Sequence, residues 1–553
     1  MPILHPPSRH ATTMPDARRG RGELRRAGIL VPLMALLALM VASCGAAPDL
    51  DGSTGSAADP DPGTAEQEEG EHLRIVTSFP VRSLDPIEGA HGNASFGAAE
   101  TPLLLSPTGE PEPHLVEVER VDELTWELEL TRDARFHNGR TVDAPALADA
   151  LRDQLERRPT AQSQLPDTTV EAIDDRTVRL VTSRPDAAVP NHLADPGVFL
   201  VYDVDAVREA GDDDQGLLVA GHYTGPYVPV VFEEERLVLE RNPDHWAGTP
   251  PLERVTVRIV ADAQARLFAV ESGEADVALY PPSDAEGLLA GVDGVGFAFS
   301  EIVAEGFRVV LDHREPPFDD VRVRRAVHLA VDEVSLAEDV LGGPYVPAVG
   351  LLPEELPGAL ALQRHDPQEA ERLLEDAGWE PGDGGVRERD GQRLEFRLMT
   401  YPQQPDLDPM SVAIQAQLSE VGFLVAIERS EDINTTMEDP GAWEAALYCC
   451  GQVSGGGAIE PIWQRYFRTD GDVNWGAAGN AELDALIDEL ALADGERREE
   501  LLAEIQRAVI EEEAAIFYAA TRKRFAVTSE RWDGFELRPN LIFVTAETAP
   551  SDS

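Results

Sequence analysis

Two adjacent cysteines, Cys449 and Cys450, are the residues after the N-terminal segment whose side chains are best suited to redox or metal chemistry. In an oxidising compartment such neighbours can close a strained disulfide. A soft metal would need further ligands nearby, and the surrounding sequence offers none. We favour a reduced, largely buried pair at the end of a strand, with the disulfide and metal capture as the alternatives.

Sequence motifs of common catalytic centres are missing. The chain has no phosphate-loop pattern and no His-Glu-x-x-His, and no two histidines after the N-terminal segment share one helical turn, which argues against a zinc enzyme. Ser454 stands one position late for a nucleophile elbow. With 102 acidic residues, chance carboxylate pairs are expected everywhere. We therefore expect no catalysis, no cofactor and no metal centre, with a secreted hydrolase as the opposing hypothesis.

The third cysteine, Cys44, follows a segment ordered like a secretory signal: a basic stretch from Arg18 to Arg26, then an apolar run and small residues. Val41-Ala-Ser-Cys-Gly45 resembles the lipobox of bacterial lipoproteins, whose cysteine is lipidated and becomes the N-terminus. The alternatives are a transmembrane anchor, for which the run is short, or an ordinary buried cysteine. We predict a signal peptide over 1–43, lipidation of Cys44 and an extracytoplasmic, membrane-anchored protein.

Composition separates a tether from a folded body. Residues 44–71 are rich in Gly, Ala, Ser, Asp, Pro and Glu, too polar for a core, so we expect a lipidated flexible tether and a fold that begins near His72. The formal net charge is −56, and no basic cluster follows the signal, which argues against nucleic-acid binding. We interpret the acidic excess as a solvated surface, with cation recruitment as the alternative.

Strands and helices mix along the body. Period-2 patterns predict strands, and 3.6-residue patterns with capping signals at Asp366 and Gly378 predict helices. The expected strands cover 73–78, 124–130, 177–182, 254–260, 276–280 and 396–401; the expected helices cover 323–331, 366–377, 483–490 and 501–509. Since 553 residues exceed what one core usually organises, we expect a mixed α/β (α+β) fold in two lobes.

Several segments together resemble the family-5 extracellular solute-binding proteins of ATP-driven importers, a group with oligopeptide, dipeptide and nickel binders. The matching segments, in chain order, are Ser83–Pro86, Arg132–Gly139 with Ala144–Leu147, Tyr223–Tyr227, Leu239–Trp246, Glu271–Asp276, Pro317–Ala326, Asp366–Trp379 and Asn480–Ile487. They span the body from about Leu73 to Val544.

The resemblance implies a periplasmic-binding-protein-like fold whose two lobes close on a ligand. Its first lobe would cover 72–305 with an inserted subdomain at about 100–185, the second lobe 306–520, and residues 521–553 would return to the first lobe. The implied partners are a small solute and the permease and ATPase subunits of an ABC importer. In our leading hypothesis the solute is an oligopeptide. We expect the protein to be a monomer. A nickel chelate, an oligosaccharide or another non-peptide solute is the alternative.

Peptide-binding relatives place an aspartate for the peptide amine in the segment that here reads Leu447 to Pro461, and this segment has no aspartate. The resemblance therefore does not carry over that anchor. The residues expected to contact ligand are Tyr227, Tyr401, Tyr448, Cys449, Gly451, Glu460 and Trp463, with Trp443, Tyr466 and Trp475 as further aromatic candidates because rings offer broad contact at low entropic cost.

Overall fold

The computed structural model describes residues 72–211, 213–354, 358–449, 459–493 and 495–551. The predicted signal, the tether and its lipidation site Cys44 lie outside the described residues, as do Cys450 and Gly451. Within the described ranges, no helix is both long and apolar enough to cross a membrane.

The six strands and four helices expected from local sequence patterns all form. Strands form at β1 (His72–Thr77), β5 (Thr125–Leu130), β7 (Thr177–Val181), β10 (Arg254–Ile259), β11 (Val277–Leu279) and β17 (Glu395–Thr400). Helices form at α9 (Val321–Ala330), α11 (Pro367–Asp376), α15 (Ala481–Leu490) and α16 (Gly495–Arg507). Helix α11 begins as its sequence predicts, because the Glu369 N–H donates to the Asp366 carboxylate at 3.0 Å.

The first lobe is built on one end of an 11-stranded sheet. Its strand order is β11-β1-β10-β9-β8, with β8 (Tyr227–Glu233) and β9 (Arg236–Arg241) antiparallel and β1 parallel to both β10 and β11. Alternate residues such as Leu73, Val255 and Leu239 point into one buried core. The lobe's helices are α1 (Ala90–Ser95), α4 (Val189–Leu193), α5 (Val204–Ala210), α6 (Asp214–Ala220), α7 (Ala263–Glu271) and α8 (Ala285–Leu288).

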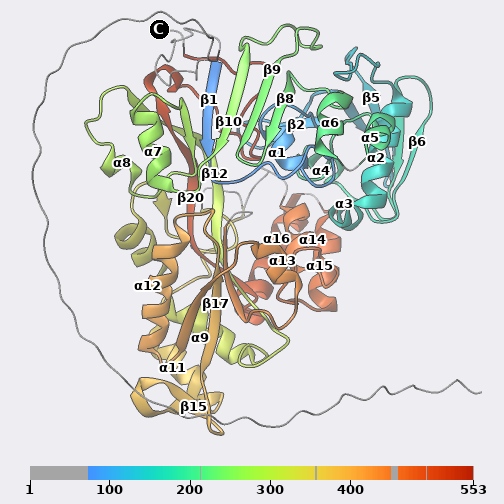
Figure 1. The fold of residues 1–553 in the computed structure, drawn as a ribbon. Coiled ribbons are helices and arrows are strands. Elements are labelled where there is room, and N and C mark those ends of the chain that lie inside the picture. Colours follow the sequence, from blue (N-terminus) through green and yellow to red (C-terminus); the bar gives the residue numbers. More distant parts are fainter. Residues whose placement is uncertain (1–71, 212, 355–357, 450–458, 494, 552–553) are drawn as a thin grey trace, which may run out of the picture. The chain divides into compact units, whose positions relative to one another are not determined.

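A smaller four-stranded sheet has a core of its own, with the order β4-β5-β7-β6. Strands β4 (Val116–Arg120) and β6 (Thr169–Ala172) flank β5 and β7, and the long helix α2 (Ala144–Arg157) contacts β6 and β7. Trp126 and Leu128 on β5 are buried in this core, as their alternation predicts. Figure 1 shows this sheet beside α2 at one side of the first lobe.

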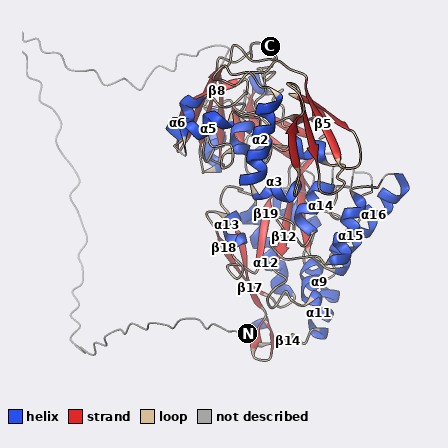
Figure 2. Ribbon diagram, turned by 90° about the vertical axis from the view of Figure 1, so that its right-hand side faces the viewer, coloured by secondary structure: helices blue, strands red, loops and turns tan. Residues whose placement is uncertain are grey.

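The second lobe uses the other end of the large sheet, in the order β18-β17-β19-β12. Strands β18 (Leu424–Arg429) and β19 (Ala445–Cys449) both run parallel to β17. The helices of this lobe also include α12 (Leu407–Glu420), α13 (Ile433–Glu438) and α14 (Glu460–Phe467), and its core is separate from those of the first lobe. Helix α14 contacts α3 (Pro159–Gln164) of the first lobe (Figure 2).

Two long strands, β12 (Val295–Leu311) and β20 (Ile516–Ser529), run through both lobes (Figure 1). They pair with each other at both ends; β20 also pairs with β11 at its first-lobe end, and β12 also pairs with β19 at its second-lobe end. The register between them shifts three times in the stretch from Phe299 to Arg308. Irregularities of this kind bend the strands that contain them. We therefore expect β12 and β20 to bend in the stretch where they pass from one lobe to the other.

Short elements complete the chain. They are β2 (Leu103–Leu105), β3 (Pro111–Pro113), β13 (Tyr345–Val346), β14 (Glu380–Pro381), β15 (Arg387–Arg389), β16 (Gln392–Arg393), α10 (Glu333–Ser335) and the π-helical turns Leu336–Leu341 and Ala508–Glu512. Two of the family-like segments make contacts within the first lobe. The His137 ring nitrogen, for example, lies 2.9 Å from the Gly225 carbonyl oxygen, and the Trp246 and His245 ring nitrogens both contact Glu100.

Candidate binding cavity

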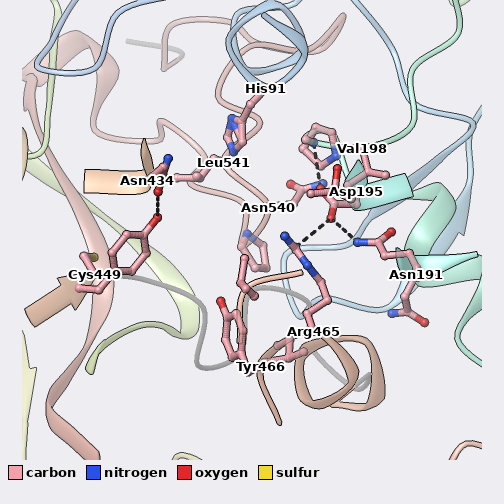
Figure 3. A pocket seen from close by; sticks show the side chains of 18 of the residues that line it. His91, Asn191, Asp195, Val198, Asn434, Cys449, Arg465, Tyr466, Asn540 and Leu541 are labelled. Atoms are coloured by element: carbon pink, nitrogen blue, oxygen red, sulfur yellow. Dashed lines mark hydrogen bonds and ion pairs between the residues drawn. The ribbon is translucent and has the colours of Figure 1, made fainter. Parts of the chain in front are cut away.

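A cavity of about 480 Å³ lies where the two lobes meet, a volume typical of small-molecule sites. The first lobe lines it from α1, α3 and the α4 region, and the second lobe from β12, α13, β19 and α14. Its polar and aromatic lining residues include His91, Asn191, Asp195, Arg308, Asn434, Tyr448, Arg465, Tyr466, Trp475, Arg524 and Asn540. Figure 3 shows most of these side chains converging from both lobes.

Ionic contacts hold α14 near the first lobe at the cavity edge. The Arg465 guanidinium donates to the Asp472 carboxylate at 3.0 Å and lies 4.0 Å from Asp195 across the cavity (Figure 3). The Ser163 hydroxyl of the first lobe also donates to Asp472, at 3.3 Å. One wall of the cavity therefore depends on how closely the lobes approach.

Aromatic side chains form the second-lobe wall. The Tyr448 hydroxyl donates to the Asn434 side-chain oxygen at 2.8 Å, and its ring meets Trp475 edge-on with centroids 5.1 Å apart. Burial raises the pKa of Tyr448 to about 12, so the hydroxyl keeps its proton at neutral pH. With its oxygen engaged, the Asn434 side chain keeps its N–H groups for another acceptor.

Charge in the cavity is mainly positive. Three arginines line it, and the Arg308 guanidinium lies 3.7 Å from the Tyr466 ring centroid. Burial lowers the pKa of His91; Asp195 opposes this effect, whereas the positive charges of Arg524 and Arg158 add to it. The imidazole is therefore neutral near pH 7, and the positive charge comes from the guanidinium groups alone.

The predicted contact residues fall into two groups. Tyr448 and Cys449 line the cavity, and so do Tyr466 and Trp475. Tyr401 follows β17 directly behind this wall, where its hydroxyl accepts the Cys449 N–H at 3.1 Å. Glu460 begins α14.

Tyr227 and Trp463 lie elsewhere. Tyr227 is buried in the first-lobe core, and Trp463 and Trp443 are buried in the second-lobe core, so these rings are not among the described residues that line the cavity. On α14 the reason is helical spacing, because Trp463 and Phe467 share the core-facing side while Ile462, Arg465 and Tyr466 face the cavity.

Cys449 corrects one expectation. It is disulfide-bonded, contrary to the reduced pair favoured from the sequence, and both other cysteines of the chain lie outside the described residues. A disulfide is the state that an oxidising, extracytoplasmic compartment favours. Within the described part of the chain, no group of three or more His, Cys, Asp or Glu side chains is arranged to hold a metal ion.

Sequence reasoning missed the charged lining residues. Arg308 on β12, Arg465 on α14 and Arg524 on β20 are far apart in the chain and come together only in the folded protein. One signal was available: Arg308 is a charged residue inside the apolar run Phe307 to Leu311, where a buried strand otherwise excludes charge.

The fold and the sequence both match known solute receptors. Residues 110–455 match the family described as bacterial extracellular solute-binding proteins, family 5 middle. The nickel-binding protein NikA of Staphylococcus aureus is 24% identical over 429 residues, covering 76% of this chain and 82% of that protein. The probable D,D-dipeptide-binding periplasmic protein DdpA of Escherichia coli is 25% identical over 443 residues, covering 76% and 80%.

Solved structures agree on the fold. NikA of Staphylococcus aureus in complex with Ni(L-His)2 superposes with a TM-score of 0.77 at 20% identity, covering 87% of this chain and 100% of that chain. The oligopeptide-binding protein AppA of Bacillus subtilis, in complex with a nonapeptide, gives 0.74 at 17% identity, covering 86% and 98%. Both match the two-lobed, mixed α/β architecture. The chain therefore belongs to family 5 of the bacterial extracellular solute-binding proteins.

Proposed function

We propose that this protein captures a peptide-type solute in the cavity between its lobes and delivers it to the permease of an ABC importer. The observation that carries the proposal is the cavity itself, which both lobes line in a chain of this family. A ligand that contacts both lobes stabilises the arrangement in which they meet, which is how such receptors report that they are loaded.

The lining suits a small peptide because it combines apolar surface with several kinds of polar group. Tyr448, Tyr466 and Trp475 offer ring faces to side chains, whereas the amides of Asn191 and Asn434 can pair with peptide groups. The volume of about 480 Å³ favours a short peptide over a long one. The relatives reported above are a nickel-binding and a probable D,D-dipeptide-binding protein by their names, and one solved structure holds Ni(L-His)2, so a chelate that brings its own organic ligands is the second candidate.

We further propose that lipid on Cys44 anchors a monomer to the outer face of the cell membrane. The motif around Cys44 and the polar composition of residues 44–71 support this arrangement, since a tether of that composition lets a receptor stay near its permease. The protein binds and releases its solute without chemical change, as its family does, so we expect no turnover.

Native mass spectrometry of the mature protein, purified from its own cells, tests the proposal by weighing any retained solute. A series of masses that fragment as short peptides would support the peptide reading. One mass with a nickel isotope pattern would replace it with the chelate. Protein that carries no solute and binds none from a peptide mixture or from nickel with histidine would contradict solute capture.

A further inference from the structure

Arg308 is a buried cation that lacks a counter-ion among the described residues. The side chain is 2% exposed, yet it forms no ion pair and no hydrogen bond with any described residue, and its Nε is buried without an acceptor. Residues 450–458, which follow Cys449 in the chain and lie outside the described residues, contain no Asp or Glu. A buried charge of this kind is costly unless something pairs with it.

The other two arginines of the cavity differ from Arg308 in this respect. Arg465 pairs with Asp472, and the Arg524 Nε donates to the Glu305 carboxylate at 3.0 Å. Among the arginines that line the cavity, Arg308 is therefore the one without an acidic partner in the described part of the chain, although the sequence has 102 acidic and 46 basic residues. Where acids are so abundant, a buried arginine without one points to a partner from outside the chain.

The surroundings of Arg308 hold its guanidinium in place without neutralising it. Its carbon atom Cζ lies 3.7 Å from the Tyr466 ring centroid and 5.3 Å from that of Tyr448, with Trp475 at 5.8 Å. Rings stabilise a cation through their faces but accept no full hydrogen bond from it. The donors on the guanidinium edge thus remain for an oxygen acceptor in the cavity.

We infer that Arg308 binds a carboxylate of the captured solute and selects for solutes that carry one. A single planar fork of N–H donors matches one carboxylate in bidentate fashion. One unmatched positive charge fits a monoanion better than a doubly charged phosphate. This inference deepens the proposed function and rests on it for the cavity's role, but it makes a separate claim about the chemistry of the ligand.

Fluorine NMR with two matched fragments tests the inference without knowledge of the natural solute. The probes are 4-fluorobenzoate and its neutral analogue 4-fluorobenzamide, and the readout is broadening of the fluorine line on titration into the protein. We expect broadening by the benzoate alone. Arg308→Met keeps the packing volume and should weaken benzoate binding roughly 10- to 100-fold, the range for a charged hydrogen bond. Arg308→Lys keeps the positive charge and should retain part of the benzoate binding.

Arg393→Met is the matched control, because Arg393 is exposed on β16 and does not line the cavity. It should bind the benzoate like the wild type. Arg308→Met loses the ring contacts of the guanidinium as well as a buried charge without an ion pair to a described residue, and these effects oppose each other, so the variant should unfold near the wild-type temperature without ligand. Unchanged binding in Arg308→Met, no benzoate broadening in the wild type, or equal binding of the benzamide would overturn the inference.

The two proposals fail separately. Methyl esterification adds 14 Da to a solute for each carboxylate that it carries. A retained natural solute that gains no mass in this reaction would overturn the role of Arg308, while the transport function would stand. The opposite outcome is a protein that binds the benzoate through Arg308 but captures no solute from its cells or from added mixtures. That result would support the anion site and contradict the transport proposal.

Discussion

Glu305 should be the most sensitive single position for stability, because it lies at the centre of an ionic network on the strands that cross between lobes. Its carboxylate accepts from the Arg522 Nε at 2.6 Å and from the Arg524 Nε at 3.0 Å, and all three side chains are buried. Although burial alone would raise the pKa of Glu305, these two arginines hold it below its usual value.

The perturbation is Glu305→Gln, which keeps the shape but leaves two buried guanidinium groups without this carboxylate. Breaking a buried ion pair by removing one partner costs about 3–5 kcal/mol. Arg522 still pairs with Asp406 at 2.8 Å, and Arg524 still donates to the carbonyls of Arg538 and Pro539. The expected loss therefore lies at the lower end of that range, about 3 kcal/mol.

Urea denaturation followed by circular dichroism measures the loss through the transition midpoint and slope. Glu301→Gln is the matched control, since Glu301 lies on the same strand but is exposed, and it should stay within about 0.5 kcal/mol of the wild type. Because the pKa of Glu305 is depressed in the folded state, its contribution is present at neutral pH and lost as the pH falls through the folded-state pKa. A change of less than about 0.5 kcal/mol in Glu305→Gln at pH 7 would refute the reasoning.

Three further outcomes follow from other sites. Burial raises the pKa of Glu333 to about 8, so between about pH 4.5 and pH 8 the folded protein holds a proton there that the unfolded chain has released. The stability of the protein should therefore fall as the pH rises through this window. Calorimetry should show that Glu333→Gln is more stable than the wild type at about pH 8 but not near pH 4.5. Asp366→Ala removes the cap of α11 and should cost about 1 kcal/mol in urea denaturation, whereas Asp376→Ala in the last turn should cost nothing. Cys44→Ser should move the protein from the membrane to the soluble fraction with unchanged solute binding; equal membrane retention would contradict the anchor.

The mixed α/β class, the two lobes and a minority of the individual strands and helices could be predicted from the sequence. Alternation placed β5 and β10, and the Asp366 capping signal placed α11, because those patterns reflect burial and hydrogen bonding within one element. The family-like segments led to the correct family for a related reason. Residues such as His137 and Trp246 make contacts within the first lobe, so their role in this chain is in the scaffold rather than in ligand contact.

The candidate site could be predicted only in part. Tyr448 and Cys449, which were predicted to contact ligand, line the cavity at the end of β19, and their contact with a ligand stays a prediction. Arg308 lies on strand β12 and Arg465 on helix α14, which meet only in the folded protein. The charge of Arg308 inside an apolar run marks that residue as unusual, but no local pattern shows that the two arginines share a cavity. Trp463 was named for its aromatic character, but its place on the helix turns it into the core, and helix orientation is set by tertiary packing.

The central claim is that a solute binds between the lobes and places a carboxylate on Arg308. A crystal structure of the protein loaded with its own co-purified solute tests it most directly. The account predicts electron density in the cavity lined by Asn191, Tyr448 and Tyr466, with two oxygen atoms of one carboxylate within about 3 Å of the Arg308 guanidinium. Solute bound outside this cavity, or bound in it with a neutral or apolar group against Arg308, would contradict the account.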